Sequence, residues 1–131
     1  SSILEDLRLL FSFKMDSENP FILILSGQSI IRNKLQMAVN SPLKQRISLR
    51  HNVKGLQKDE IVTYLDNRLA LAGLTEKIFT PEAVEAIFSF SKGAPRIINN
   101  LAVASLMYAT SKKLNLIDDE AVYQGQRDSE I

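Results

Sequence analysis

The second half of the chain carries helix start and stop signals at short intervals. Residues 58–72 place apolar side chains on one helical face and end at Gly73, which suits the left-handed position after a helix. Residues 80–82, Thr-Pro-Glu, combine a capping hydroxyl, a proline for the first helical position and an acidic residue. They predict a second helix, which Gly93 closes. These start and stop signals predict a helical bundle from residue 55 onward.

Two further helices complete the predicted bundle. Pro95 opens a helix whose inward stripe contains small residues suited to close packing: Ile97, Ile98, Leu101, Ala102, Ser105 and Ala109. Residues 114–117 are expected to return to the core, and Asp118 to cap a short last helix that runs through Gln124. The polar tail from residue 125 to 131 is expected to fray.

The first part of the chain mixes helix and strand signals. Residues 3–11 have helical apolar spacing, whereas residues 21–25, Phe-Ile-Leu-Ile-Leu, form an apolar run typical of a strand buried on both faces. Ser29 is expected to cap a helix to about Val39, which Asn40-Ser41-Pro42 breaks. Residues 47–53 alternate apolar and polar side chains, as a short strand does.

These elements predict a mainly α fold with a small α/β remnant. The predicted parts are residues 1–54, the end of an α/β domain with one or two short strands, and residues 55–131, a helical domain. Two strands do not form a stable sheet alone. The run at 21–25 therefore has to pair with 47–53, associate with another chain or lie against helices, and an exposed strand edge favours dimerisation.

Composition excludes several classes of function. The 131 residues contain no cysteine and one histidine, His51, which argues against thiolate metal sites, zinc sites and His-based triads. Lys plus Arg number 16 against 15 Asp plus Glu, so the net charge of +1 gives no global attraction to nucleic acid. Neither a membrane-spanning run nor a signal-peptide pattern is present, and we expect a cytoplasmic protein without a membrane span.

The order of these motifs resembles the later part of AAA+ ATPases in the group of secretion-pathway ATPases and transposition-helper ATPases. The resemblance spans nearly the whole chain, and its order and spacing are more specific than any single piece. Residues 4–13 resemble the helix after the Walker B strand, and residues 21–28 resemble the sensor 1 strand. Residues 43–47 resemble the segment that bears an inter-subunit arginine. The lid is resembled by residues 64–73, 79–83 and 93–101.

The resemblance implies that Arg96, with Pro95 in the Gly-Ala-Pro-Arg turn, is a sensor 2 arginine that contacts the nucleotide γ-phosphate. A guanidinium in the first turn of a helix opposes the helix dipole at a cost of about 0.3–1 kcal/mol. A residue in an unfavourable place favours a functional role. The alternative is a surface arginine paired with an acidic residue.

Two catalytic roles are also implied. Gln28 resembles the sensor 1 residue that orients the attacking water, ahead of Ser26; the alternative is that residues 26–29 only turn the chain. Arg46 resembles an arginine finger inserted into a neighbouring subunit. Arg50 and Arg32 compete for that role, and a lone surface arginine is usually solvated.

The chain departs from the family because it lacks the motifs that bind phosphate and magnesium. It has no Gly-x-x-x-x-Gly-Lys-Ser/Thr loop and no apolar strand ending in an acidic pair to hold magnesium; residues 118–120 are acidic but follow the lid. ATP and Mg²⁺ are therefore expected in the intact parent protein, and neither is expected to bind this chain alone. The chain is expected to be inactive by itself, either as a piece of a longer ATPase or as the product of a shortened gene.

Two functions follow. The first is a sensor and lid region that couples nucleotide state to oligomer assembly, through self-association at AAA+ interfaces, in DNA transposition or a related mobile-element or secretion process. Its partners would be DNA, a transposase or a secretion component, with a preference for the mobile-element or generic ATPase setting. The second is a non-enzymatic helical module, derived from the lid, that binds DNA or protein.

Overall fold

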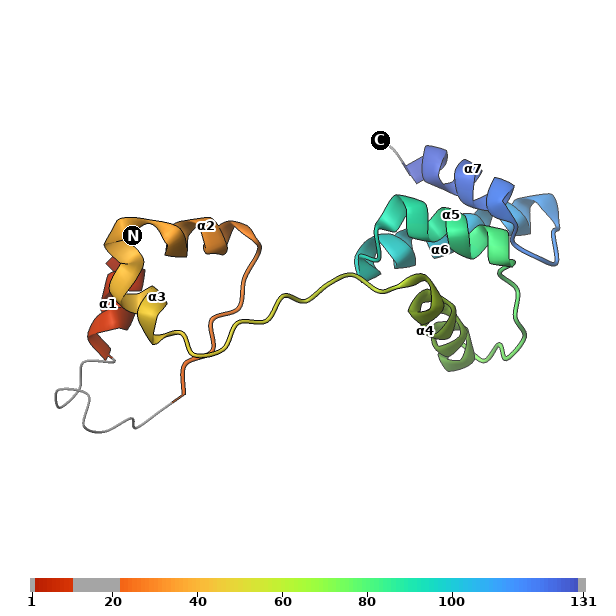
Figure 1. The fold of residues 1–131 in the computed structure, drawn as a ribbon. Coiled ribbons are helices and arrows are strands. Elements are labelled where there is room, and N and C mark those ends of the chain that lie inside the picture. Colours follow the sequence, from red (N-terminus) through yellow and green to blue (C-terminus); the bar gives the residue numbers. More distant parts are fainter. Residues whose placement is uncertain (1, 11–21, 130–131) are drawn as a thin grey trace. The chain divides into compact units, whose positions relative to one another are not determined.

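The chain divides into two compact units, Ser1–Asn52 and Val53–Ile131 (Figure 1). The structure is a computed structural model and describes residues 2–10 and 22–129. Among these residues helices are the only regular elements apart from one isolated bridge, so the predicted mainly helical class is confirmed.

The first unit contains short helices with little buried surface. They are α1 (Ser2–Leu10), α2 (Ile30–Gln36), the 3₁₀ turn η2 (Ala38–Asn40) and α3 (Ser41–Arg46). Leu4 of α1 and Leu43 of α3 are buried, in line with the contact between these helices. Asn40 is also buried, and its side-chain amide donates to the carbonyl oxygen of Lys34 at 2.6 Å. This bond holds the turn between α2 and α3.

Neither predicted strand is present in the described residues. Residues 22–28 and 47–57 have no regular structure, and Phe21 lies outside the described part. Ile24 is 83% exposed and Leu49 is 91% exposed, whereas Leu23 and Leu25 are half-buried, so the predicted apolar faces are at most partly covered. A strand is stabilised by hydrogen bonds to a neighbouring strand and by packing on its faces. The described parts of these segments have neither hydrogen bonds to a neighbouring strand nor full packing on their faces. Their absence explains why the predicted strands did not form.

The helix boundaries in the first unit also differ from the prediction. Ser29 makes no side-chain capping bond, and α2 ends at Gln36 rather than near Val39. Pro42 was expected to break a helix but lies in the first turn of α3. A proline is tolerated there because the N–H groups of the first turn have no partner within the helix. The residues that were predicted to break a helix, Asn40-Ser41-Pro42, therefore lie at the start of α3.

The second unit is a bundle whose helices follow the predicted start and stop signals, except at the end of the last helix. The helices are α4 (Lys58–Leu71), α5 (Pro81–Ser91), α6 (Pro95–Lys112) and α7 (Asp119–Ser129). Gly73 has a φ of 91°, and Thr80 Oγ1 accepts from the Ala83 N–H at 3.2 Å. Asp118 Oδ1 accepts from the Ala121 N–H at 2.9 Å. The predicted glycine stop and both predicted caps are confirmed.

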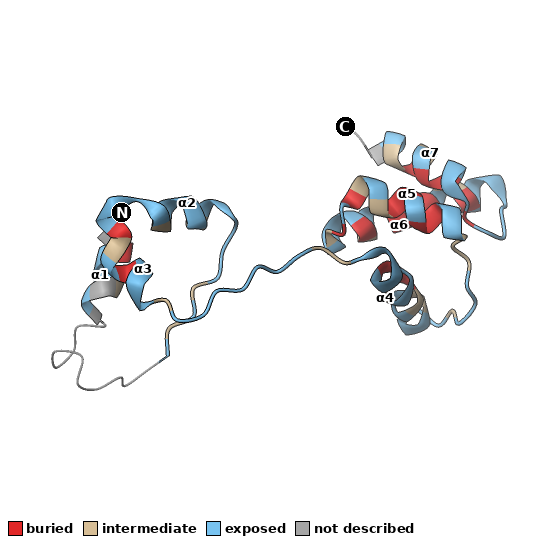
Figure 2. Cartoon of the chain, in the orientation of Figure 1, coloured by how far each residue is buried: buried red, intermediate tan, exposed pale blue. Residues whose placement is uncertain are grey.

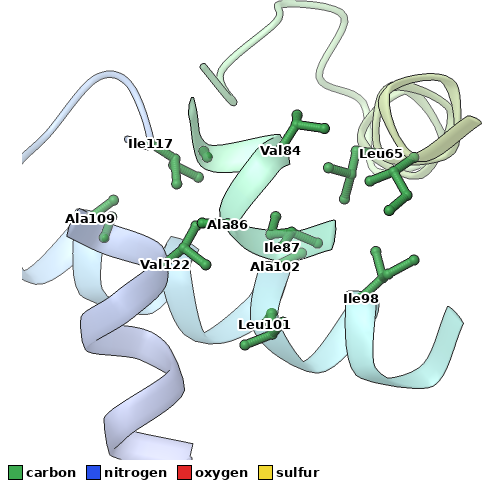
Figure 3. Packing of buried hydrophobic residues seen from close by; sticks show 13 residues of the cluster. Leu65, Val84, Ala86, Ile87, Ile98, Leu101, Ala102, Ala109, Ile117 and Val122 are labelled. Atoms are coloured by element: carbon green, nitrogen blue, oxygen red, sulfur yellow. The ribbon is translucent and has the colours of Figure 1, made fainter. Parts of the chain in front are cut away.

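A single hydrophobic core joins the helices of the second unit (Figures 2 and 3). Its largest fully buried apolar side chains come from α4, α5, α6, the α6–α7 connector and α7, and are Ile61, Ile87, Ile98, Ile117 and Val122. The predicted α6 stripe is buried except at Ile97, which is 43% exposed. Because each helix contributes to the same core, this unit has the packing of an independently stable domain.

The two longer connectors of the second unit are bonded to each other. Phe79, before α5, and Ile117, before α7, form an isolated parallel bridge. The Ile117 N–H donates to the Ile78 carbonyl at 2.7 Å, and the Thr80 N–H donates to the Ile117 carbonyl at 2.9 Å. The predicted return of residues 114–117 to the core takes place at Ile117, whereas Leu116 is 56% exposed.

The last helix is longer than predicted and packs closely on α6. α7 continues past Gln124 to Ser129, and Gly125 is buried within it. A Cβ atom on Gly125 would lie 2.8 Å from the Ala104 carbonyl carbon and from the Ser105 nitrogen. Gly125 therefore marks a close helix contact and not the start of a frayed tail.

Candidate functional site

The turn between α5 and α6 is held in a left-handed backbone conformation. Lys92 has a φ of 49° and Gly93 a φ of 78°. The buried Ser91 accepts from the Gly93 N–H through its hydroxyl oxygen at 3.1 Å. Its carbonyl oxygen accepts from the Ala94 N–H at 2.9 Å. The turn is therefore fixed by bonds to Ser91, and the direction in which α6 starts is fixed with it.

Pro95 and Arg96 follow this turn as the first residues of α6. The first turn of α6 contains no acidic residue, and Ala94 provides no capping side chain. Arg96 is exposed, and in the described part of the chain no hydrogen bond or ion pair is found for its guanidinium group. The alternative of a surface arginine paired with an acidic residue is not seen. A guanidinium beside the positive end of a helix forms a place suited to an anion.

A polar contact between α4 and α6 lies one turn after Arg96. The Tyr64 hydroxyl donates to Asn99 Oδ1 at 3.2 Å, and both residues are half-buried. Ile98, next to Asn99, is fully buried in the core. These contacts fix the rotation of α6 about its axis and leave Arg96 on the exposed side.

The chain that enters α4 also touches this turn. The Leu56 N–H donates to the Gly93 carbonyl oxygen at 2.8 Å, and Leu56 packs against the core. Sequence reasoning treated Gly55 only as a punctuation mark and missed both this contact and the role of Ser91. A glycine can mark a close backbone approach, but the sequence does not show which segment approaches it.

Gln28 lies at the start of α2 in the first unit. It is exposed, and its carbonyl oxygen accepts from the Ile31 N–H at 3.0 Å. Its backbone takes part in the turn that leads into α2. The sensor 1 role of its side chain stays a prediction.

Arg46 is the last residue of α3 and is exposed. Its two competitors, Arg50 and Arg32, also lie in the first unit. The Arg50 guanidinium donates to the Lys44 carbonyl oxygen at 3.3 Å, and the Arg32 guanidinium donates to Asn52 Oδ1 at 3.1 Å. Of the predicted site residues, Pro95 and Arg96 therefore lie in the second unit, whereas Gln28 and Arg46 lie in the first.

Neither of the shallow grooves found in the second unit contains Arg96. One follows α4 and includes the carboxylates of Asp59 and Glu60; the other includes Glu82, Glu85 and Asp119, with Lys58 paired to Glu85. Both are too acidic to attract phosphate. Across the residues that the structure describes, no group of acidic or histidine side chains is arranged to hold a metal ion. The residues present fit one cationic contact to a phosphate oxygen and do not fit a magnesium site.

Comparison with known proteins finds one informative similarity. The chain is 32% identical over 110 residues to the general secretion pathway protein A of Aeromonas hydrophila, a match that covers 84% of this chain and 20% of that protein. No family model and no solved structure matched. In the described residues, no helix is both long enough and apolar enough to cross a membrane.

Proposed function

We propose that this chain is the sensor and lid region of an AAA+-type ATPase and that Arg96 contacts the phosphates of a bound nucleotide. The observation that carries the proposal is the exposed guanidinium of Arg96 at the uncapped start of α6, for which the described part of the chain offers no partner. An arginine in this position has no structural benefit for its helix. A phosphate group would satisfy both the guanidinium and the helix start.

The rest of the nucleotide grip has to come from residues outside this chain. The sequence lacks a phosphate-binding loop, and the described residues provide no magnesium site. ATP and Mg²⁺ are accordingly proposed as ligands of a larger protein, in which Gln28 orients water and Arg46 acts in a neighbouring subunit. The proposal includes oligomer assembly that depends on nucleotide state, and a cytoplasmic location where ATP is available.

The similarity to a protein named for the general secretion pathway supports the secretion setting. The transposition setting, with DNA and a transposase as partners, stays a prediction that none of the comparisons supports. Because the chain spans 20% of its relative, the activity of that whole protein is part of the proposal and is not transferred as fact.

The first experiment reads the gene upstream of this chain and measures ATP turnover by the protein that it encodes. A Gly-x-x-x-x-Gly-Lys-Ser/Thr loop is expected there. Arg96→Ala should lower the turnover rate about 100- to 1000-fold, in the range found when one charge-stabilising group is removed from a transition state. Arg96→Lys should restore part of the activity, since it retains the charge but not the planar fork.

Arg127→Ala is the matched control, because Arg127 is an exposed arginine in the last turn of α7. It should leave turnover unchanged. Equal turnover in Arg96→Ala and the unaltered protein, with both folded by circular dichroism, would refute the assignment of Arg96.

The second candidate function is a non-enzymatic helical module that binds DNA. It is favoured by the acid-free stretch of residues 22–54, which contains Arg32, Lys34, Lys44, Arg46, Arg50 and Lys54. Binding to duplex DNA that weakens steeply with salt and does not respond to ATP would support it over the first function. Absence of binding to DNA at low salt would exclude it.

A further inference from the structure

Two glycines bring the incoming chain into backbone contact with the α5–α6 turn. A Cβ atom on Gly55 would lie 2.5 Å from the Lys92 carbonyl oxygen, and one on Gly93 would lie 2.2 Å from the Leu56 carbonyl oxygen. Real Cβ atoms do not approach other atoms this closely. Only glycine at both positions allows the Leu56 N–H to reach the Gly93 carbonyl at 2.8 Å.

The contact lies at the boundary between a fixed and an exposed part of the chain. On its C-terminal side, the Gln57 N–H donates to Glu60 Oε2 at 2.7 Å in a capping box that starts α4. On its N-terminal side, residues 48–54 are all exposed and have no regular structure; Val53 is 87% exposed. Residues 55–57 therefore belong to the helical bundle, and the chain becomes free to change direction only before Gly55.

The other side of the contact is the turn that positions Arg96. The Leu56 N–H donates to the carbonyl oxygen of Gly93, and the Gly93 N–H donates to the hydroxyl oxygen of Ser91. Gly93 is separated from Arg96 by Ala94 and Pro95 alone. Pro95 has a restricted φ, so a displacement of Gly93 passes into the first turn of α6 instead of being absorbed by rotation at the intervening residues.

We propose that Gly55 and Gly93 form a backbone clamp that couples the direction of the incoming chain to the position of Arg96. A movement of the chain before residue 55 is then delivered first to the turn that carries Arg96 and not to the start of α4. Gly55 and Gly93 act as positioning residues. The proposal rests on the proposed function only in treating Arg96 as the group whose position matters.

Amide hydrogen exchange followed by NMR on the 131-residue chain tests the clamp without nucleotide. In the unaltered chain, the Leu56 amide should exchange about 100-fold or more slowly than the Val53 amide, because opening it requires release of the turn. In Gly55→Ala, this protection should fall at least about 10-fold, and the amide resonances of Ala94, Arg96 and Ile97 should shift. The Thr80 and Ile117 amides should keep their protection, since their bonds lie elsewhere in the unit.

Gly73→Ala is the matched control. Gly73 has a φ of 91° but no atom within 4 Å of the added Cβ, so this substitution strains the backbone without touching another segment. It should leave Leu56 protection and the Arg96 resonance unchanged. Gly55, in contrast, has no left-handed φ, so alanine there tests only the close approach.

Three results would overturn the clamp. They are rapid exchange of Leu56 in the unaltered chain, unchanged resonances from residue 94 to 97 in Gly55→Ala, and an equal loss of protection across α5, α6 and α7 in that variant, which indicates general destabilisation. The first needs no variant and decides the matter even if Gly55→Ala does not fold. Because no nucleotide is present, the clamp can fail while the phosphate role of Arg96 stands, and the reverse also holds.

Discussion

At the scale of single residues, the polar groups around the α5–α6 turn account for its shape. Ser91 is 2% exposed, and its hydroxyl oxygen is the partner of the buried Gly93 N–H. Because this N–H has lost contact with water, its bond to Ser91 is worth more than an exposed hydrogen bond. The orientation of Arg96 thus depends on a serine that itself contacts no ligand in the proposed function.

Ser91→Ala should lower the free energy of unfolding by about 1–3 kcal/mol, because it leaves the Gly93 N–H buried without an acceptor. Urea denaturation followed by circular dichroism measures this change. Ser89→Ala is the control, since Ser89 lies in the same helix but is exposed. Equal effects of the two substitutions would show that the Ser91 hydroxyl does not support the turn.

At the scale of elements, local signals predicted the second unit well and the first unit poorly. Thr80, Asp118 and Gly73 act within a few residues of their own position, so the sequence alone was sufficient to place the ends of their helices. The strand predicted at residues 47–53 depended on partners that an apolar pattern cannot supply. Contacts between distant segments, such as Gly55 with Gly93, were also out of reach, because glycine has no side chain that reports a neighbour.

Gly125 provides a test of element packing. Replacing a glycine in a helix by alanine normally stabilises the helix by about 0.5–1 kcal/mol. Here the added Cβ would lie 2.8 Å from the backbone of α6, so we expect Gly125→Ala to destabilise the fold by about 1–3 kcal/mol through overpacking. Asp128→Ala, at an exposed position of α7, should change stability by less than about 0.5 kcal/mol. A rise in the urea midpoint of Gly125→Ala would contradict the close contact with α6.

At the scale of the whole chain, the two units differ in how much each one buries. The described part of the first unit buries Leu4, Asn40 and Leu43, whereas the second unit has a continuous core (Figure 2). Net stability is a small difference between burial and lost conformational entropy, so the described part of the first unit contributes little of its own. Unfolding curves of this chain therefore report mainly on the second unit.

Limited proteolysis should separate the units. Among the described residues, trypsin is expected to cleave after Arg50 or Lys54, which lie in the exposed segment without regular structure, before it cleaves after Arg68 in α4. Mass spectrometry of early fragments identifies the sites. The variant with Arg50→Gln and Lys54→Gln should lose these early fragments. First cleavage at Arg68 would mean that α4 opens more readily than the segment before it.

The bridge between Phe79 and Ile117 has a consequence for how the bundle opens. It ties the connector before α5 to the connector before α7, so the two connectors cannot separate without breaking the Ile117 hydrogen bonds. The two connectors are then expected to open in one cooperative event instead of fraying separately. The connector that leads into the C-terminal helix thereby stabilises a loop that lies almost forty residues earlier in the chain.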